Sequence, residues 1–333
     1  VTGVQTCALP ISGVSKSTVS RLISGKGYVS ADSQEKILKA MKELNYTPNY
    51  VARNLRAGAT KTIGFLAPSY LGSLGIFLNR FISIAKKYNY SVTLFFTDGD
   101  QQKEIDALNQ LKYKQLDGLF LLTRTNEWSV IEPYSAYGPL ATWHRIDSPN
   151  IYSSYIDHYS GYYRSLEYLQ QQGYQKIGHV LGNPENLNTH ARKRAMKDFY
   201  ENTQAPWQAE WLINDQYTNH SGRKIAHYWQ QLTDKPEALA FYNDHVAAEF
   251  ISELENLNYA VPRDVAVIGF DNSYVSELMH ITTVDYAIQY QAENSFIYLY
   301  NQLNQTNIPE KKLTVRLVER RTVPKKDPAD QSL

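Results

Sequence analysis

The sequence contains a single cysteine, Cys7, among its 333 residues. One thiol excludes an intramolecular disulfide and a metal cluster built from cysteines. The chain also lacks any apolar run near the roughly 18 residues that a membrane-spanning helix needs, and its N-terminus lacks the pattern of a signal peptide. We therefore expect a cytoplasmic protein without a membrane partner.

Motifs of the common catalytic classes are missing as well. The eight histidines show no HExxH or other close zinc-ligand spacing, and no nucleophile elbow, P-loop or G-x-G-x-x-G is present. Most histidines are therefore expected to be surface or hydrogen-bonded polar positions. We predict no metal, no cofactor and no enzymatic activity.

Length and charge indicate two parts with different partners. A chain of 333 residues is about twice the usual domain length, and its net charge is only +1. Residues 12–61, however, hold nine Lys or Arg against three acids, a balance of 9 − 3 = +6 that leaves about −5 for the rest. This asymmetry favours a small domain for a polyanion joined to a larger domain for another ligand.

The basic segment has the pattern of two short helices. In GVSKSTVSRLISGK, Ser15 is a good N-cap, and Val14, Val19 and Leu22 or Ile23 can face inward. In ADSQEKILKAMKELNY the apolar residues at helical spacing are Ile37, Leu38, Met41 and Leu44. The polar side chains of the first helix are then left on its outer face.

The order of these residues resembles the LacI family of bacterial repressors. The matching positions are Gly13, Val14, Ser15, Thr18, Val19, Ser20, Arg21, Val29, Ser30, Leu44, Asn45, Tyr46, Pro48, Asn49, Ala52, Arg53, Leu55 and Arg56. The resemblance implies a helix-turn-helix headpiece in which Lys16 and Ser17 read bases in the major groove. It implies further that Ser15, Thr18, Ser20 and Arg21 hold phosphates or neighbouring base edges.

A hinge helix at residues 49–56 is implied by the same resemblance. Its DNA-contacting residues would be Asn49, Ala52, Arg53, Leu55 and Arg56, and Leu55 would wedge between central base pairs from the minor groove. Such a wedge works as a symmetric pair. The resemblance therefore implies a homodimer and a palindromic operator.

From Lys61 onward, buried strands alternate with amphipathic helices in two series. The first runs from KTIGFLAP to LDGLFLLT, and the second runs from about Gly161 to VAVIGFD. Alternation of this kind predicts an α/β fold of two lobes, each a doubly wound parallel sheet covered by helices. A ligand is then expected where the carboxyl ends of the strands face each other across a cleft.

Polar residues follow these strands and are the candidate effector ligands. They are Ser69 and Ser73 after the first strand, Thr123 and Arg124 after LDGLFLL, Asn243 and Asp244 after ALAFY, and Asp271 after VAVIGF. Each one alone could be a loop residue or a helix cap, as Asp244 in particular could be. Their convergence on one cleft favours a binding role.

The body also resembles the periplasmic-binding-protein-like body of LacI-family repressors. The segments YNDHVAAEFISELENLNYAVPRDVAVIGFDN and LVERRTVPK carry this likeness. It implies an effector-binding arginine at Arg192, with Arg194 as the competing candidate, and effector contacts from Asp271, Tyr217 and Asp157. A carboxylate, an arginine and a stacking tyrosine suit a hydroxyl-rich sugar, although a purine would also stack and bond.

These observations define the expected boundaries. Residues 12–47 form a partial helix-turn-helix, 48–60 the hinge and linker, and 61–333 the effector-binding domain. Its first lobe is expected at 61–158 and 288–318, and its second at 159–287 and 319–333. Residues 117–139 resemble, more weakly, the catabolite control protein B subgroup.

The expected function is a repressor whose operator affinity responds to a small effector, by induction or by corepression. The alternative from another class is a sugar-binding protein of the same fold without regulatory DNA binding. An enzyme that uses acids such as Asp244 and Asp271 as a glycosidase pair is a third reading. The basic headpiece favours the repressor.

Residues 1–11 do not fit the family. They match, codon for codon, the translation of a common sequencing-library adapter, in the place where a LacI-family chain has its first helix. We expect them to be an artefact, with the headpiece lacking that helix and binding its operator weakly. Gly3 and Pro10 make this stretch a poor helical substitute.

Overall fold

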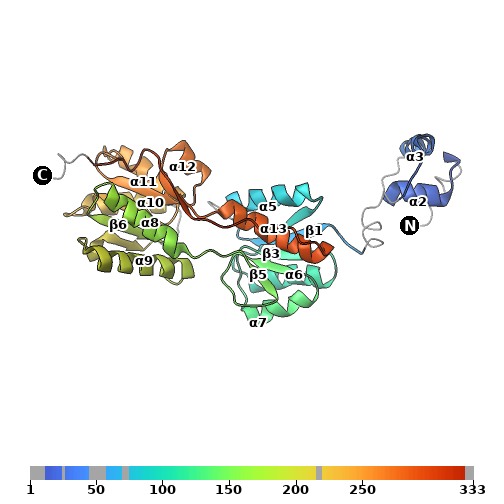
Figure 1. Ribbon diagram of the computed structural model, residues 1–333, viewed down its shortest axis with the longest axis horizontal. Coiled ribbons are helices and arrows are strands. Elements are labelled where there is room, and N and C mark those ends of the chain that lie inside the picture. Colours follow the sequence, from blue (N-terminus) through green and yellow to red (C-terminus); the bar gives the residue numbers. More distant parts are fainter. Residues whose placement is uncertain (1–11, 25–26, 45–57, 70–74, 215–219, 327–333) are drawn as a thin grey trace.

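The computed structural model describes residues 12–24, 27–44, 58–69, 75–214 and 220–326. Several positions expected to be functional lie outside these ranges. They are residues 1–11, the expected hinge residues Asn49, Ala52, Arg53, Leu55 and Arg56, and the expected effector ligands Ser73 and Tyr217. The described chain has two small N-terminal helices and a body of two α/β lobes, as the pattern of strands and helices predicts (Figure 1).

The headpiece helices are α2 (Lys16–Ser24) and α3 (Ala31–Glu43). Ser15 begins α2 as expected, because its Oγ accepts the backbone N–H of Thr18 at 3.2 Å. Ser30 caps α3 in the same way through Ser33. Val19, Val29, Ile37 and Ala40 are buried, whereas Leu38, one of the apolar residues at helical spacing, is 57% exposed.

The first lobe contains a five-stranded parallel sheet in the order β2-β1-β3-β4-β5. The strands are β1 (Thr62–Ala67), β2 (Ser91–Phe96), β3 (Gly118–Leu121), β4 (Leu140–Thr142) and β5 (Ile151–Ser153). Its helices are α5 (Gly75–Lys87), α6 (Gln101–Lys112), α7 (Trp128–Ile131), η2 (Glu132–Ala136) and, from far along the chain, α13 (Ile288–Asn304). Alternate residues of β1 point to opposite faces, so Phe65 packs with Phe77 and Phe81 while Leu66 belongs to the separate core cluster that contains Leu108.

The second lobe contains six strands in the order β11-β10-β9-β8-β6-β7. They are β6 (Ile177–Leu181), β7 (Leu212–Asn214), β8 (Ala238–Phe241), β9 (Ala266–Phe270), β10 (Thr282–Asp285) and β11 (Arg316–Val318), and only β11 is antiparallel to its neighbour. The helices are α8 (His158–Gln171), α9 (Leu187–Thr203), η3 (Ala209–Trp211), α10 (Ser221–Gln231), α11 (Asp244–Asn256) and α12 (Tyr274–Leu278). The α8 and α9 helices pack in one core of this lobe, and α10 and α11 pack in the other.

The chain crosses between the lobes three times. Crossings follow β5 and β10, and the last follows α13, which packs on α5 of the first lobe before the chain returns to the second sheet (Figure 1). One expected boundary is corrected. Arg316–Val318 had been placed in the first lobe, but these residues pair with β10 of the second sheet, because the returning chain completes the edge of that sheet.

Candidate functional site

The outer face of α2 presents the side chains expected to contact DNA. Ser15, Lys16, Ser17 and Arg21 are exposed, and Thr18 and Ser20 are half-buried. The hydroxyls of Ser17 and Thr18 each lie 2.8 Å from the Ser15 hydroxyl. The sequence folds this way because Val19 turns inward onto α3, which leaves the polar face of α2 outward.

On the first lobe, two of the expected effector residues bind groups of nearby loops. Ser69 donates its hydroxyl and its backbone N–H to the Asp98 carboxylate, and these bonds lower the pKa of Asp98. The Arg124 guanidinium donates to the carbonyl of Asn126 at 2.9 Å and lies over the ring of Trp128. Thr123 is half-buried beside it.

Asp157 and Arg194 form a surface pair. The Asp157 carboxylate caps α8 by accepting the N–H of Tyr159 at 2.8 Å, and Arg194 Nη2 lies 3.2 Å from its other oxygen. Both side chains are substantially exposed, at 41% and 58%. The two candidate arginines therefore have opposite environments, since Arg192 is 4% exposed.

Arg192 is a buried cation at the carboxyl end of the second sheet. Its Nη2 donates to His158 Nδ1 at 2.9 Å and to the carbonyl of Tyr242 at 3.1 Å, and its guanidinium lies 4.7 Å from the centre of the Phe270 ring. Its Nε is buried without a hydrogen-bond partner among the described residues. Burial lowers the pKa of Arg192, and the nearby charge of Asp271 opposes that shift.

Asp271 directly follows β9 and supplies the opposite charge. The residue is 5% exposed and has φ of 124°, in the region that side chains rarely adopt. Its carboxylate accepts a hydrogen bond from Tyr286, whose pKa is raised by burial and by this negative charge. A buried arginine with an unbonded donor near a buried carboxylate can bind a ligand that offers both acceptors and donors.

The expectation for Asp244 is wrong in this structure. Its side chain is fully buried, and its two oxygens accept the N–H of Ser273 at 2.7 Å and the hydroxyl of Thr283 at 2.6 Å. Neither oxygen is exposed to a ligand, because both tie α11 to the loop after β9 and to β10. Asn243 is the N-cap of α11, where its Oδ1 accepts the N–H of Val246 at 2.8 Å.

Sequence reasoning missed three aromatic residues at this site. Trp143 follows β4, Tyr286 follows β10 and His158 begins α8. The rings of Trp143 and Tyr286 stack across the two lobes with centroids 6.3 Å apart, and His158 packs against Tyr286 at 4.7 Å. The same rule that selected the polar residues, proximity to the carboxyl end of a strand, would have found Trp143 and Tyr286.

The buried histidines depart in part from the expectation. His158 and His179 are hydrogen-bonded, but His144 Nε2 and His245 Nδ1 are buried without a partner among the described residues. In the described part of the chain, no group of three or more His, Cys, Asp or Glu is placed to hold a metal ion. The described helices include none that is long and apolar enough to span a bilayer.

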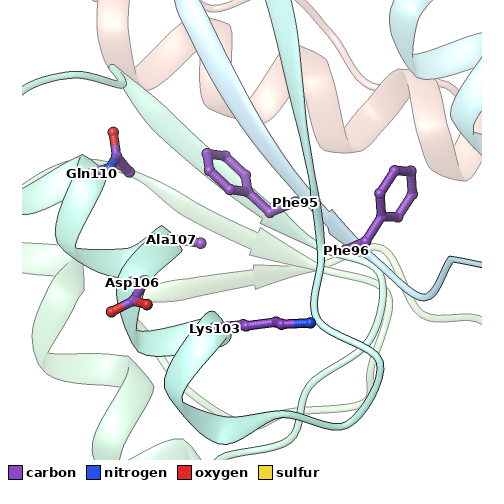
Figure 2. Close-up of a pocket in the computed structure, with 6 residues that line it drawn as sticks. All are labelled: Phe95, Phe96, Lys103, Asp106, Ala107 and Gln110. Atoms are coloured by element: carbon purple, nitrogen blue, oxygen red, sulfur yellow. The ribbon is translucent and has the colours of Figure 1, made fainter.

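A separate hollow of about 220 Å³ lies on the first lobe between β2 and α6 (Figure 2). It is lined by Phe95, Phe96, Lys103, Asp106, Ala107 and Gln110. None of the expected effector residues lines it. The chemistry described above, a buried cation with an unbonded donor beside a carboxylate, lies instead at the second sheet.

Comparison with known proteins gives the chain its family. Residues 11–49 match the bacterial regulatory proteins of the lacI family, and residues 166–323 match a periplasmic binding protein-like domain. The NTD biosynthesis operon regulator NtdR of Bacillus subtilis (strain 168) is 35% identical over 276 residues, which cover 82% of this chain and 84% of NtdR. The chain belongs to the LacI family. This LacI-family chain is also 30% identical to catabolite control protein A of Priestia megaterium, over 80% of this chain and 81% of that protein.

Solved structures show the same fold. The lac repressor dimer bound to operator and the anti-inducer ONPF superposes with a TM-score of 0.79 at 23% identity, over 95% of this chain and 98% of that one. A LacI-family regulator from Lactobacillus casei with bound sucrose superposes with a TM-score of 0.70 at 22% identity, over 78% of this chain and 99% of that one. The α/β body with an N-terminal helix-turn-helix is thus the architecture of a LacI-family transcriptional regulator.

Proposed function

We propose that this regulator is a homodimeric repressor of a palindromic operator, and that a small effector bound between its lobes controls its operator affinity. We propose a sugar or sugar derivative as the effector, no enzymatic activity, and a cytoplasmic location. The observation that carries the proposal is the buried Arg192, whose Nε has no partner among the described residues and which lies near the Asp271 carboxylate.

The chemistry of this pair suits a hydroxyl-rich ligand. A hydroxyl donates to a carboxylate and accepts from a guanidinium, so neighbouring hydroxyls satisfy both groups at once. A ligand that binds here beside the Trp143 and Tyr286 stack touches the contact between the lobes. Differential affinity for two lobe arrangements is all that such control requires, and it fits an inducer and a corepressor equally.

The DNA-binding half of the proposal is supported by the lacI-family match over residues 11–49 and by the exposed polar face of α2. We propose base contacts from Lys16 and Ser17, and phosphate or edge contacts from Ser15, Thr18, Ser20 and Arg21. The hinge residues, from Asn49 to Arg56, would complete the contact in the minor groove. We also propose effector contacts from Ser69, Thr123, Arg124, Asp157 and Asn243, and the same role stays a prediction for Ser73 and Tyr217, which lie outside the described residues.

A selection experiment tests both halves. A random-sequence DNA library is selected on the chain as it stands and on a version in which a family-type first helix replaces residues 1–11. We expect a palindrome to be enriched, with the stronger binding in the second version. Operator affinity is then measured by fluorescence anisotropy with glucose, sucrose, adenine and guanine. If a palindrome is enriched but its affinity changes with none of these ligands, the proposal of a sugar effector is wrong. If no sequence is enriched by either version, the proposal of a repressor is wrong.

A further inference from the structure

The hydrogen bond between Arg192 and His158 fixes the state of the imidazole. A guanidinium only donates, so His158 Nδ1, 2.9 Å from Arg192 Nη2, must be the acceptor and carry no proton. The residue is buried, at 5% exposed, and its pKa is held well below its ordinary value, first by burial and then by the Arg192 charge. His158 is therefore a neutral acceptor for a cation, which is an uncommon role for a histidine.

The position of that acceptor is determined by rings on both sides. His158 stacks on Phe270, with centroids 5.1 Å apart and planes at 29°, and packs against Tyr286 at 4.7 Å. Tyr286 in turn stacks on Trp143 of the first lobe with an interplanar angle of 9°. The imidazole has no room to rotate its Nδ1 away from the arginine while these contacts hold.

The two acceptors of Arg192 both engage the same nitrogen. His158 Nδ1 and the carbonyl of Tyr242 each accept from Nη2, and Nε is left without a partner among the described residues. The guanidinium is thus held at Nη2, while the Nε–H has no partner among the described residues. An acceptor placed elsewhere on the fork would consume that donor instead.

We propose that His158 is the positioning residue for Arg192, holding the guanidinium by Nη2 so that its Nε remains free to donate to the effector. This inference rests on the proposed function of Arg192. It goes beyond that function because it assigns a role to a residue that needs no contact with the ligand. It also makes the position of the arginine depend on the Phe270, Tyr286 and Trp143 rings that hold the imidazole.

Two substitutions of His158 distinguish the contribution of its hydrogen-bond acceptor from the contribution of its aromatic ring. His158→Asn keeps an acceptor, because the amide Oδ1 takes the place of Nδ1, but loses most of the ring. His158→Phe keeps the ring and loses the acceptor. His227→Asn is the control, since His227 is an exposed histidine paired with Glu253 on another helix pair. Circular dichroism and the melting temperature identify any variant that fails to fold.

The position of Arg192 is read without a ligand, by modification with phenylglyoxal and mass spectrometry of the full chain. Arg194, exposed on the same helix, serves as the internal standard. We expect Arg192 to be protected in the parent, His158→Asn and His227→Asn proteins. In His158→Phe its reactivity should rise roughly tenfold to a hundredfold, because loss of a buried acceptor lets the cation move toward water. Equal protection in His158→Phe and the parent would overturn the proposal.

A second measurement holds even if His158→Phe does not fold. Nitrogen-15 spectra of the parent chain should include a neutral histidine ring with the proton on Nε2 from pH 8 to 5.5, a signal that His158→Asn removes while the signals of other buried histidines such as His179 remain. A proton on Nδ1 would overturn the inference. Calorimetric titration with glucose then tests the proposed function separately. Glucose binding that is weakened in His158→Phe and kept in His158→Asn supports both the sugar effector and the positioning role of His158. Absence of glucose binding in the parent counts against the sugar and leaves the modification result to decide on His158.

Discussion

Trp143 and Tyr286 stack across the two lobes with nearly parallel rings, whose centroids are 6.3 Å apart and whose planes differ by 9°. Both are held by Gln291 of α13, whose Oε1 accepts from Trp143 Nε1 at 2.6 Å and whose Nε2 donates to the carbonyl of Tyr286 at 2.8 Å. One side chain thus fastens both members of the stack. The contact between the lobes therefore combines the packing of two aromatic rings with hydrogen bonds that fix the position of each ring.

Replacing the ring of Trp143 tests this contact. We expect Trp143→Leu to lower the free energy of unfolding by about 2–3 kcal/mol, since it removes the stack and leaves the buried Gln291 oxygen without its donor. Trp143→Phe should cost less because the stack survives. Urea denaturation followed by circular dichroism measures both, and equal stability of the leucine and phenylalanine variants would contradict the role of the stack.

The two neighbouring arginines should differ in ligand binding. Arg192→Ala removes a buried donor, and we expect it to weaken the binding of whichever probe, glucose or sucrose, binds the parent chain by roughly 10- to 150-fold. Arg194→Ala removes only an exposed ion pair with Asp157, a kind of contact that contributes little, and should bind almost as the parent does. Calorimetric titration measures the two affinities. A larger loss in the Arg194 variant would assign the ligand contact to the other arginine.

The proposed base contact of the headpiece can be tested by comparing two substitutions that each remove one lysine charge. Lys16→Ala should weaken binding to the selected operator by about 1–3 kcal/mol and relax its sequence preference, because a base contact is lost. Lys36→Ala is the matched control, since Lys36 lies on α3 and pairs with Asp32 at 2.7 Å. Fluorescence anisotropy on the selected operator and on a scrambled duplex gives the comparison. Similar losses in both variants, on both duplexes, would indicate a general charge effect and no base reading by Lys16.

Gly222 is required by the close packing of α10 on α11. A Cβ at this position would lie 2.4 Å from Glu249 Cβ and 2.5 Å from Phe250 N, so the helices would have to separate. We expect Gly222→Ala to destabilise the chain by about 1–3 kcal/mol. Gly75→Ala is the control, because no atom of the described residues lies within 4 Å of its Cβ position and a helix favours alanine. A melting temperature unchanged by Gly222→Ala would contradict this account of the packing.

Acid should destabilise the second lobe through His179. This fully buried ring lies between the hydroxyls of Tyr162 and Tyr200, at 2.8 and 2.9 Å, and burial lowers its pKa to about 3. The unfolded chain protonates near pH 6.5, while the folded chain does not until much lower pH. Stability is therefore complete above pH 6.5 and falls as the pH drops, by about 2 kcal/mol at pH 5.

His179→Leu should flatten part of this dependence while costing stability at pH 7. Melting temperatures of the parent and the variant between pH 5 and pH 8 provide the measurement. Parallel curves for the two proteins would show that His179 does not carry the effect.

Much of the fold is predictable because its periodicities are local. The alternation from KTIGFLAP onward predicts β1, α5, β2, α6 and β3 with ends within a few residues of those observed. The strands β4, β5 and β10, of three or four residues each, were not predicted from the pattern. The equally short β3 was predicted because it lies within the longer apolar run LDGLFLLT. The edge strand β11 was assigned to the wrong lobe because its partner β10 precedes it by about 30 residues, with α13 of the other lobe between them.

The site was predicted in part, and the errors have a common cause. Arg192 was found only through the family resemblance, which left Arg194 as a competing candidate, and Asp271 was found because it directly follows a strand. Asp244 satisfies the same rule, yet its carboxylate turns into the lobe to bind Ser273 and Thr283. Position after a strand does not reveal which way a side chain turns, since that depends on partners far away in the sequence.

The sequence by itself determined the family, the α/β class, the headpiece helices and the polar residues at the strand ends, because these depend on local order and spacing. Only the tertiary structure decided which of two arginines is buried, that His158 accepts from it, and that Trp143 meets Tyr286 across the lobes. These contacts join residues between 34 and 143 positions apart. The arginine contact arises when α8 and α9 pack within the second lobe, and the ring contact arises where the two lobes meet. No local pattern encodes either packing.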